Sequence, residues 1–414
     1  IEPKFAANVN IMFNVYLKTL NNITFEKIKN KKLKLRVAIF FLTVLLLFSC
    51  KRKSSKKLIE VADSNQLELR YAKGFSINDY GTYKIIQISD PWPDAEKTYK
   101  YILITKKNAA RTSFMQDEFD GIIFNPIKKI VVTSTTHIPA LELLSVEHTL
   151  VGFPGIDYVS SKKTRKRIEN GLIRELGKNE GINTEILLEL KPDVVVGFGI
   201  DGNNRSLEII KKSGIPVIFN GDWVESSPLA KAEWIKFFGA LYNKEREADS
   251  IFNHIEKDYL EAKKSAKNIK NKPTVLSGAM HNDVWYLPNG KSTEAQLLKD
   301  ANVNYLWSDT NGTGSLKLNF ESVFTKAKDA DIWLSPSNYN SLESLKNGSS
   351  QHAMFKAFQN KNVYSFTNTT SANGGVLYYE LGMTRPDLVL KDIIKICHPE
   401  LLKNHELHFF KPLE

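Results

Sequence analysis

The stretch TEILLELKPDVVVG, residues 184–197, decides the fold. Its first seven residues carry apolar side chains at helical spacing, and Pro192 stops the helix from continuing. Val194, Val195 and Val196 then form an uninterrupted apolar run, which is typical of a strand that is buried on both faces. A helix that leads through a proline turn into a buried strand predicts an α/β unit built on a parallel sheet.

The same alternation extends to both sides of this stretch. Short apolar runs predict strands at 130–133, 150–153, 193–197 and 215–219, and again at 274–276, 331–334 and 363–366. Helical patterns separate them at 138–144, 184–190, 207–213, 294–300 and 385–396. Between the two blocks, the pattern from Pro228 to about Asn268 is helical throughout. We therefore predict an α/β fold of two Rossmann-like lobes joined by one long interlobe helix.

A β-rich extension precedes the first lobe. Apolar and polar residues alternate at 67–71, 83–88 and 99–104, which predicts strands. The turn at 90–94 carries Trp92, which we expect to be exposed. The predicted domains are an N-terminal lobe with its extension at 67–227, the interlobe helix at 228–270 and a C-terminal lobe at 271–414.

Residues 1–49 contain the pattern of an export signal. A basic block at 31–36 is followed by twelve apolar residues at 37–48, then Ser49 and Cys50. Twelve helical residues span about 18 Å, less than the ~30 Å hydrocarbon core, so a permanent transmembrane anchor is disfavoured. Because residues 1–30 do not fit a signal peptide, we expect translation to begin at Met12 or nearer Leu33.

The residues around Cys50 resemble a bacterial lipobox, in which Phe48 is a departure from the commonest residue. The resemblance implies that Cys50 receives a diacylglyceryl group, is exposed by cleavage and is then acylated, which gives firm membrane anchoring. Residues 50–66 would then form a lipid-anchored tether. The expected location is the periplasmic side of the cell envelope.

The net charge of +11 belongs to the leader. Residues 1–57 contain thirteen Lys or Arg and two acidic residues, and the remainder is balanced at 44 of each sign. A neutral body argues against nucleic-acid binding.

Ten segments together resemble the iron–siderophore and cobalamin-binding proteins of ABC importers. They include KPDVV at 191–195, SGIPV at 213–217, WVE at 223–225, PNGKS at 288–292, FESV at 320–323, ADIW at 330–333 and RPDLVL at 385–390. The others are 129–134 with His137, NTE at 183–185 and HPE at 398–400. The resemblance covers roughly residues 128–414 and implies two lobes, a rigid interlobe helix and a ligand cleft between the lobes.

The resemblance also implies partners. Glu185 and Glu321 stand where the family carries one glutamate per lobe that docks onto arginines of the permease. The expected partners are the ABC permease with its ATPase, a small-molecule metal chelate and the membrane, and the expected state is a monomer without a cofactor. Iron–siderophore, haem and cobalamin all stay open as ligands. A structural envelope lipoprotein is the alternative from another class.

Aromatic side chains near strand ends are the ligand-binding candidates, because rigid apolar faces hold bulky chelates. The candidates are Trp92, His137, Phe153, Phe198, Trp223, Trp285, Tyr286 and Tyr378. Arg205 and Arg385 could meet an anionic chelate, although Arg385 is better suited to capping local structure.

Other chemistry is disfavoured. Ser134 and His137 are close in sequence, but no Gly-x-Ser-x-Gly motif supports nucleophilic catalysis, so we predict no enzyme. Cys397, His398, His405 and His408 lack a recognised zinc spacing, so we predict no metal site. Cys397 lies in an apolar helical pattern, which indicates a buried thiol. No Walker motif is present, so the chain is not the ATPase.

Overall fold

The computed structural model describes residues 65–112, 118–371 and 374–414. The predicted signal peptide, Cys50 and most of the tether lie outside the described residues. Within the described part of the chain, no helix combines the length and apolarity needed to cross a bilayer.

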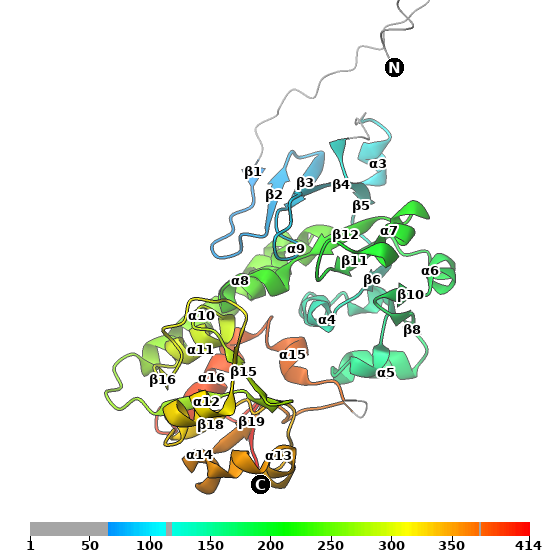
Figure 1. Ribbon diagram of the computed structural model, residues 1–414. Coiled ribbons are helices and arrows are strands. Elements are labelled where there is room, and N and C mark those ends of the chain that lie inside the picture. The colour runs from blue at the N-terminus through cyan, green and yellow to red at the C-terminus, as the bar shows by residue number, and fades with distance from the viewer. Residues whose placement is uncertain (1–64, 113–117, 372–373) are drawn as a thin grey trace, which may run out of the picture. The chain divides into compact units, whose positions relative to one another are not determined.

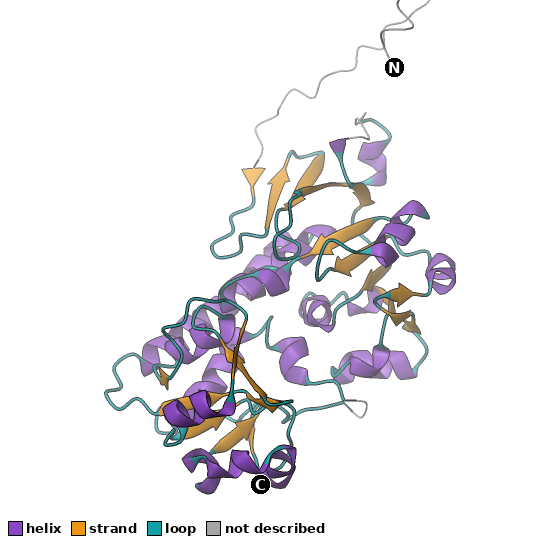
Figure 2. Cartoon of the chain, viewed as in Figure 1, coloured by secondary structure: helices purple, strands orange, loops and turns teal. Residues whose placement is uncertain are grey.

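The N-terminal lobe is built on a parallel sheet in the order β12-β11-β6-β7-β8. Its strands are β6 (Ile130–Val132), β7 (Leu150–Phe153), β8 (Arg174–Glu175), β11 (Val194–Phe198) and β12 (Val217–Asn220). Its helices are α4 (Ile138–Leu143), α5 (Lys162–Glu169), α6 (Thr184–Leu190) and α7 (Arg205–Lys212). Val194, Val195 and Val196 are completely buried, as their apolar run predicts. Figure 2 shows helices packed around these strands.

The C-terminal lobe repeats the plan with the sheet order β16-β13-β18-β19-β20, parallel except for the last pair. Its strands are β13 (Thr274–Ser277), β16 (Asn304–Tyr305), β18 (Ile332–Leu334), β19 (Val363–Ser365) and β20 (Lys411–Pro412). A second, antiparallel sheet contains β14 (Ala279–His281), β15 (Val284–Pro288) and β17 (Ser315–Leu318). The helices are α11 (Thr293–Asp300), α12 (Phe320–Ala327), α13 (Leu342–Gly348), α14 (Lys356–Gln359), α15 (Leu377–Leu381) and α16 (Pro386–Cys397).

The helical region expected over 228–270 consists of three helices, α8 (Pro228–Glu233), α9 (Ile235–Tyr242) and α10 (Glu245–Ala266). The chain turns at Asn243, which adopts a left-handed conformation with φ of 55°. Gly239 allows α9 and α10 to approach closely, because a Cβ there would lie 2.6 Å from the Cβ of Ala248.

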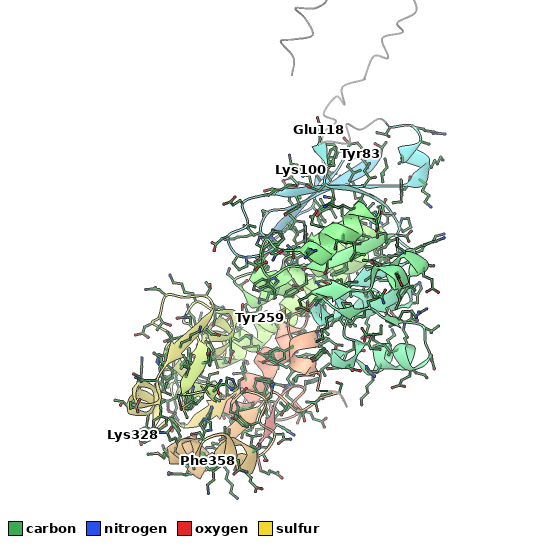
Figure 3. The ribbon with its side chains drawn as sticks, turned by 45° about the vertical axis from the view of Figure 1, so that its right-hand side comes forward. Tyr83, Lys100, Glu118, Tyr259, Lys328 and Phe358 are labelled. Carbon is green, nitrogen blue, oxygen red and sulfur yellow. The ribbon has the colours of Figure 1, made fainter. Side chains whose placement is uncertain are left out.

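Helix α10 is the element that joins the two lobes. Phe252 and Ile255 in its first half belong to the core of the N-terminal lobe. Tyr259, Ala262 and Ala266 in its second half belong to the core of the C-terminal lobe. Tyr259 is labelled on this helix in Figure 3. One straight helix embedded in both cores is a stiff connection.

The extension is a five-stranded sheet in the order β1-β2-β3-β4-β5, drawn in blue and cyan in Figure 1. Its strands are β1 (Asn65–Gln66), β2 (Phe75–Asp79), β3 (Tyr83–Ile88), β4 (Tyr99–Ile104) and β5 (Gly121–Phe124), and the short helix α3 (Lys106–Ala109) follows β4. The strand expected at 67–71 is wrong. The N–H groups of Arg70, Tyr71 and Ala72 instead donate to the carboxylate of Glu233 on α8, at 2.7 to 2.9 Å.

A second buried glutamate fastens the same sheet. Glu225 accepts hydrogen bonds from the backbone of Lys73 and Gly74 and from Nε1 of Trp234, at 2.8 to 3.1 Å. Buried carboxylates are tolerated only where several donors replace water. The extension is therefore held to the lobes by specific polar contacts as well as by packing.

Candidate functional site

The larger of the cavities lies in the C-terminal lobe, beyond the carboxyl ends of β13, β18 and β19, and has a volume of about 590 Å³. Ligands of open α/β sheets bind at this edge. Hydroxyl side chains dominate its wall, including Ser277, Ser292, Thr293, Ser335, Ser337 and Tyr379. The wall therefore offers many hydrogen-bonding groups that can adapt as donors or acceptors.

Two charged residues face the same cavity. Glu294, in the first turn of α11, accepts a hydrogen bond of 2.8 Å from Oγ of Ser277, and burial raises the pKa of its carboxyl group. Lys231 on α8 donates to the carbonyl of Trp223 at 3.0 Å. Burial lowers the pKa of Lys231, while Asp222 and Glu225 act in the opposite direction. A partly desolvated ammonium in the same cavity wall as a carboxyl group that resists ionisation favours an anionic ligand.

A second cavity, of about 420 Å³, lies in the N-terminal lobe beyond β6 and β11. Phe198, Ile200 and Arg205 are among its lining residues. Ile200 is 67 % exposed, which is unusual for a side chain of this kind. Oγ1 of Thr133, at the end of β6, accepts a hydrogen bond of 2.8 Å from the N–H of Phe198 and so ties the two strand ends together.

The short helix η6 (Asp222–Val224) connects the two cavities. The ring of Trp223 lies 5.7 Å from the ring of Phe198, and its Nε1 donates to the carbonyl of Gly199 at 3.2 Å. The carbonyl of the same Trp223 accepts the hydrogen bond from Lys231. One residue thus contacts the wall of the second cavity through its side chain and the wall of the first through its backbone.

Four predicted ligand residues lie at or beside cavities. Phe198 lines the second cavity and Tyr286 lines the first, where it is 38 % exposed. Trp223 lies between them. Tyr378 is half-buried and lines a third, more apolar cavity of about 170 Å³ between α8, α11, α15 and α16. Whether any of them touches a ligand stays a prediction.

The other four predicted ligand residues are buried in the cores, which corrects the exposure expected for Trp92, and contact of any of the four with a ligand stays a prediction. Trp92, His137, Phe153 and Trp285 are exposed by 8 %, 0 %, 2 % and 0 % respectively. The contrast between Trp285 and Tyr286 gives the reason, because successive side chains of a strand point to opposite faces. Trp285 stacks on Trp333 with ring centroids 5.4 Å apart and donates from Nε1 to the carbonyl of Ser277 at 3.1 Å.

Sequence reasoning missed the polar residues of the first cavity. Lys231, Glu294 and the serines beyond β13 and β18 are ordinary surface residue types, and their convergence depends on the tertiary fold. One signal was present. Ser292 follows the PNG turn and caps α11 by accepting from the N–H of Ala295 at 3.1 Å, which directs Thr293 and Glu294 to the strand ends.

The lobes also contact each other through α15. The carboxylate of Glu380 accepts hydrogen bonds from the N–H groups of Ser160 and Ser161 in the N-terminal lobe, at 2.6 and 2.9 Å. Burial raises the pKa of Glu380 to about 7, with a smaller contribution from Glu142. Helix α15 also packs against η3 (Thr135–His137), which helps to bury His137. Burial lowers the pKa of His137, and neither ring nitrogen has a hydrogen-bond partner within the described residues.

The two predicted docking glutamates have the same local structure. Glu185 and Glu321 are both exposed and lie in the first turns of α6 and α12. Asn183 and Asn319 cap these helices, accepting from the N–H groups of Ile186 and Ser322 at 3.1 and 2.9 Å. An acidic residue is also stabilised electrostatically at this end of a helix.

The remaining candidates have structural explanations. Arg385 donates two hydrogen bonds, of 2.8 and 2.7 Å, to the carboxylate of Asp387 in the first turn of α16, so its side chain is engaged in local structure although it does not itself cap the helix. Cys397 is buried, and burial raises the pKa of its thiol. Asp392, His405 and His408 lie close together, but Asp392 already accepts from Nε2 of His405 and from the backbone of residues 408–410. These hydrogen bonds fix the carboxylate of Asp392 close to the two histidines.

Comparison with known proteins agrees with this architecture. Residues 130–370 match the family model for periplasmic binding proteins. An uncharacterized lipoprotein of Methanocaldococcus jannaschii is 29 % identical over 374 residues, which is 86 % of each chain.

Two solved structures share the fold at low identity. A periplasmic solute-binding protein of Veillonella parvula gives a TM-score of 0.53 at 18 % identity, covering 69 % of this chain and 85 % of that one. A periplasmic heme-binding protein of Pseudomonas aeruginosa gives 0.51 at 15 % identity, covering 70 % and 95 %. With the family match over more than half of its length and two lobes of the expected design, the chain belongs to the periplasmic binding protein family.

Proposed function

We propose that this protein is the substrate-binding lipoprotein of an ABC importer, which captures an iron–siderophore chelate and delivers it to a membrane permease. The observation that carries the proposal is the hydroxyl-lined cavity with Lys231 at its edge. Its volume of about 590 Å³ suits a small-molecule ligand. A ferric chelate with carboxylate, catecholate or hydroxamate oxygens presents acceptors to hydroxyl groups and negative charge to an ammonium.

Haem is the second candidate. Met280, His281, Tyr286, Tyr339 and Tyr379 line the first cavity, and Met, His and Tyr are all residue types that ligate haem iron. Hydroxyl groups on half of the residues in the same wall favour a more polar chelate. No residue in this cavity favours a corrinoid over an iron–siderophore or haem.

Two exposed glutamates support delivery of the ligand to a permease. Glu185 and Glu321 offer one negative charge per lobe, each at the start of a capped helix. Charges of this kind steer a complex and fix its register. Anchoring through Cys50 would keep the protein beside its permease on the periplasmic side of the membrane.

The test is a binding panel on the purified chain. Tryptophan fluorescence would be titrated with ferrioxamine B, ferric enterobactin, hemin and cyanocobalamin. We expect a ferric siderophore to bind with micromolar or tighter affinity, about −8 kcal/mol or better. Binding of hemin alone would establish the second candidate. Failure of every chelate would overturn the proposed function.

A further inference from the structure

The turn of the extension between β3 and β4, residues 90–94, reaches the carboxyl edge of the N-terminal lobe. Trp92 in this turn is 8 % exposed. Its ring packs edge-to-face on Phe219 of β12, with centroids 5.1 Å apart, and on Tyr99 of β4 at 5.8 Å. The turn therefore inserts an aromatic side chain between the extension and the end of the lobe sheet.

Two glycines make room for the insertion. A Cβ on Gly199 would lie 2.8 Å from Cε3 of Trp92, and a Cβ on Gly221 would lie 2.5 Å from the carbonyl oxygen of Asp90. Real Cβ atoms do not approach other heavy atoms so closely. Neither glycine has a positive φ, so the absent side chain matters here for space and not for backbone conformation. At both positions, only glycine leaves enough room for the turn.

The same two glycines are chain neighbours of the aromatic residues at the second cavity. Gly199 lies between Phe198 and Ile200, which line that cavity, and its carbonyl accepts the hydrogen bond from Nε1 of Trp223. Gly221 immediately precedes η6, which carries Trp223. A displacement of the turn would thus be transmitted to Phe198 and Ile200 in the cavity wall and to Trp223, whose ring packs on Phe198.

The extension also holds the far end of η6. Glu225 follows η6, and its carboxylate accepts the N–H groups of Lys73 and Gly74 at 2.9 and 2.8 Å. Residues 90–94 at one end and residues 73–74 at the other thus fix a segment of three residues. The extension lies outside the residues that match the family model, which begin at 130.

We propose that the extension is a positioning element for the ligand site. Its turn at 90–94 holds Phe198, Ile200 and Trp223 in the arrangement that bounds the cavity of the N-terminal lobe. Trp92 acts through the backbone of these residues and does not touch the ligand. The effect on ligand affinity rests on the proposed function, whereas the effect on the local backbone does not.

The test is a double-mutant cycle on the full chain. Gly199→Ala introduces a Cβ that would lie 2.8 Å from Cε3 of Trp92 and 3.0 Å from Oδ1 of Asn204. Trp92→Leu removes the first of these two contacts while keeping an apolar side chain. Gly202→Ala is the matched control, because a Cβ there meets nothing within 4 Å and lies in the same loop. The readouts are amide hydrogen exchange of residues 199–206 and 222–225, affinity for the anionic chelate ferric enterobactin, and the melting temperature as a check on folding.

We expect Gly199→Ala to speed exchange in both segments and to weaken ferric enterobactin binding about tenfold, a size typical of coupled neighbouring residues. In the Trp92→Leu background, the same change should have a clearly smaller effect, because only the contact with Asn204 remains. Gly202→Ala should match the parent. An equal effect of Gly199→Ala in both backgrounds, or no effect on exchange in either, would overturn the positioning role. If no variant binds the chelate and neither does the parent, the proposed function fails, while hydrogen exchange still decides on the extension.

Discussion

The two lobes share a plan and differ at the carboxyl edges of their sheets, where the two cavities lie. Each has a five-stranded sheet and an asparagine-capped helix that presents an exposed glutamate. In the N-terminal lobe, the edge is shaped by aromatic rings around Trp92 and Trp223. In the C-terminal lobe, it is an open cavity of hydroxyls beside Lys231 and Glu294. The difference suggests that one lobe supplies shape and the other supplies polar recognition.

The largest expected effect concerns the exposed glutamate that each lobe carries. Reversing both Glu185 and Glu321 to Lys should abolish uptake of the ligand by cells, because a like charge facing the permease costs several kcal/mol. Affinity of the purified protein for the ligand should not change, since both side chains are exposed on helix starts. The loss should be greater at low ionic strength, where screening is weaker.

Glu343→Lys is the matched control for this experiment. Glu343 is also exposed and lies in the first turn of a capped helix, α13. Its reversal should leave uptake intact. If uptake by the double variant equals that of the parent, the docking role is wrong. If affinity falls together with uptake, the two acids belong to the ligand site.

The next prediction concerns the contact between the lobes. Burial raises the pKa of Glu380 from an ordinary value near 4.5 to about 7, so the folded protein holds this proton more tightly than the unfolded chain. Its favourable contribution is therefore complete below about pH 4.5 and is lost as the pH rises through about 7. The loss should be up to about 3 kcal/mol of the free energy of unfolding.

Urea unfolding at intervals from pH 4.5 to 8 measures this dependence. The variant Glu380→Gln should lose the part of the pH dependence that the parent shows in this window. Glu343→Gln, at an exposed site in α13, should retain it. An unchanged pH profile in Glu380→Gln would show that ionisation of this group does not control the contact between α15 and the N-terminal lobe.

The third prediction concerns Lys231, which lines the polar cavity of the C-terminal lobe. Lys231→Met should weaken binding of a ferric siderophore about 10- to 100-fold, the size expected for a charge-assisted hydrogen bond. The equivalent change of the exposed Lys291 should have no effect, although both lysines carry the same charge. Equal weakening by both variants would mean that the attraction is long-range and that Lys231 makes no specific contact.

Much of this architecture could be predicted from local patterns. The Val194–Val196 run is a central buried strand, and the proline, glycine and asparagine signals around it mark real helix ends. The break at Asn243 was missed because an apolar helical pattern continues across it, and only the packing of Gly239 against Ala248 shows that the chain turns back. The segment 67–71 alternates as a strand does, yet its N–H groups bind Glu233, which is distant in sequence.

The ligand site was harder to predict for a physical reason. Aromatic residues near strand ends are equally suited to a cavity wall and to a core, and only the face of the strand separates Trp285 from Tyr286. Lys231 and Glu294 come from helices that lie more than sixty residues apart in the chain. Nothing local in the sequence indicates that they line one cavity. Glu185 and Glu321 were easier to recognise, because their position depends only on the start of their own helix.

The smallest expected effect compares the contribution of one hydroxyl group to ligand affinity in each lobe. Tyr286→Phe removes one hydroxyl from the cavity of the C-terminal lobe and should weaken siderophore binding by about 1 kcal/mol, a typical net value for one hydrogen bond. Phe198→Tyr adds one hydroxyl on the side of the N-terminal lobe, where we expect no gain. Both changes keep the aromatic ring, so packing differs little. A gain in Phe198→Tyr as large as the loss in Tyr286→Phe would contradict the division between the lobes.

Trp285→Phe supplies the control for this last comparison, because Trp285 is the chain neighbour of Tyr286 but points into the core. Its substitution removes the hydrogen bond to Ser277 and part of the stacking on Trp333, so it should lower the free energy of unfolding by about 1–3 kcal/mol. Affinity should stay at the parent value at temperatures where the variant is folded. Loss of affinity at constant stability would instead place Trp285 in contact with the ligand, and the cavity would then have to open further than the structure shows.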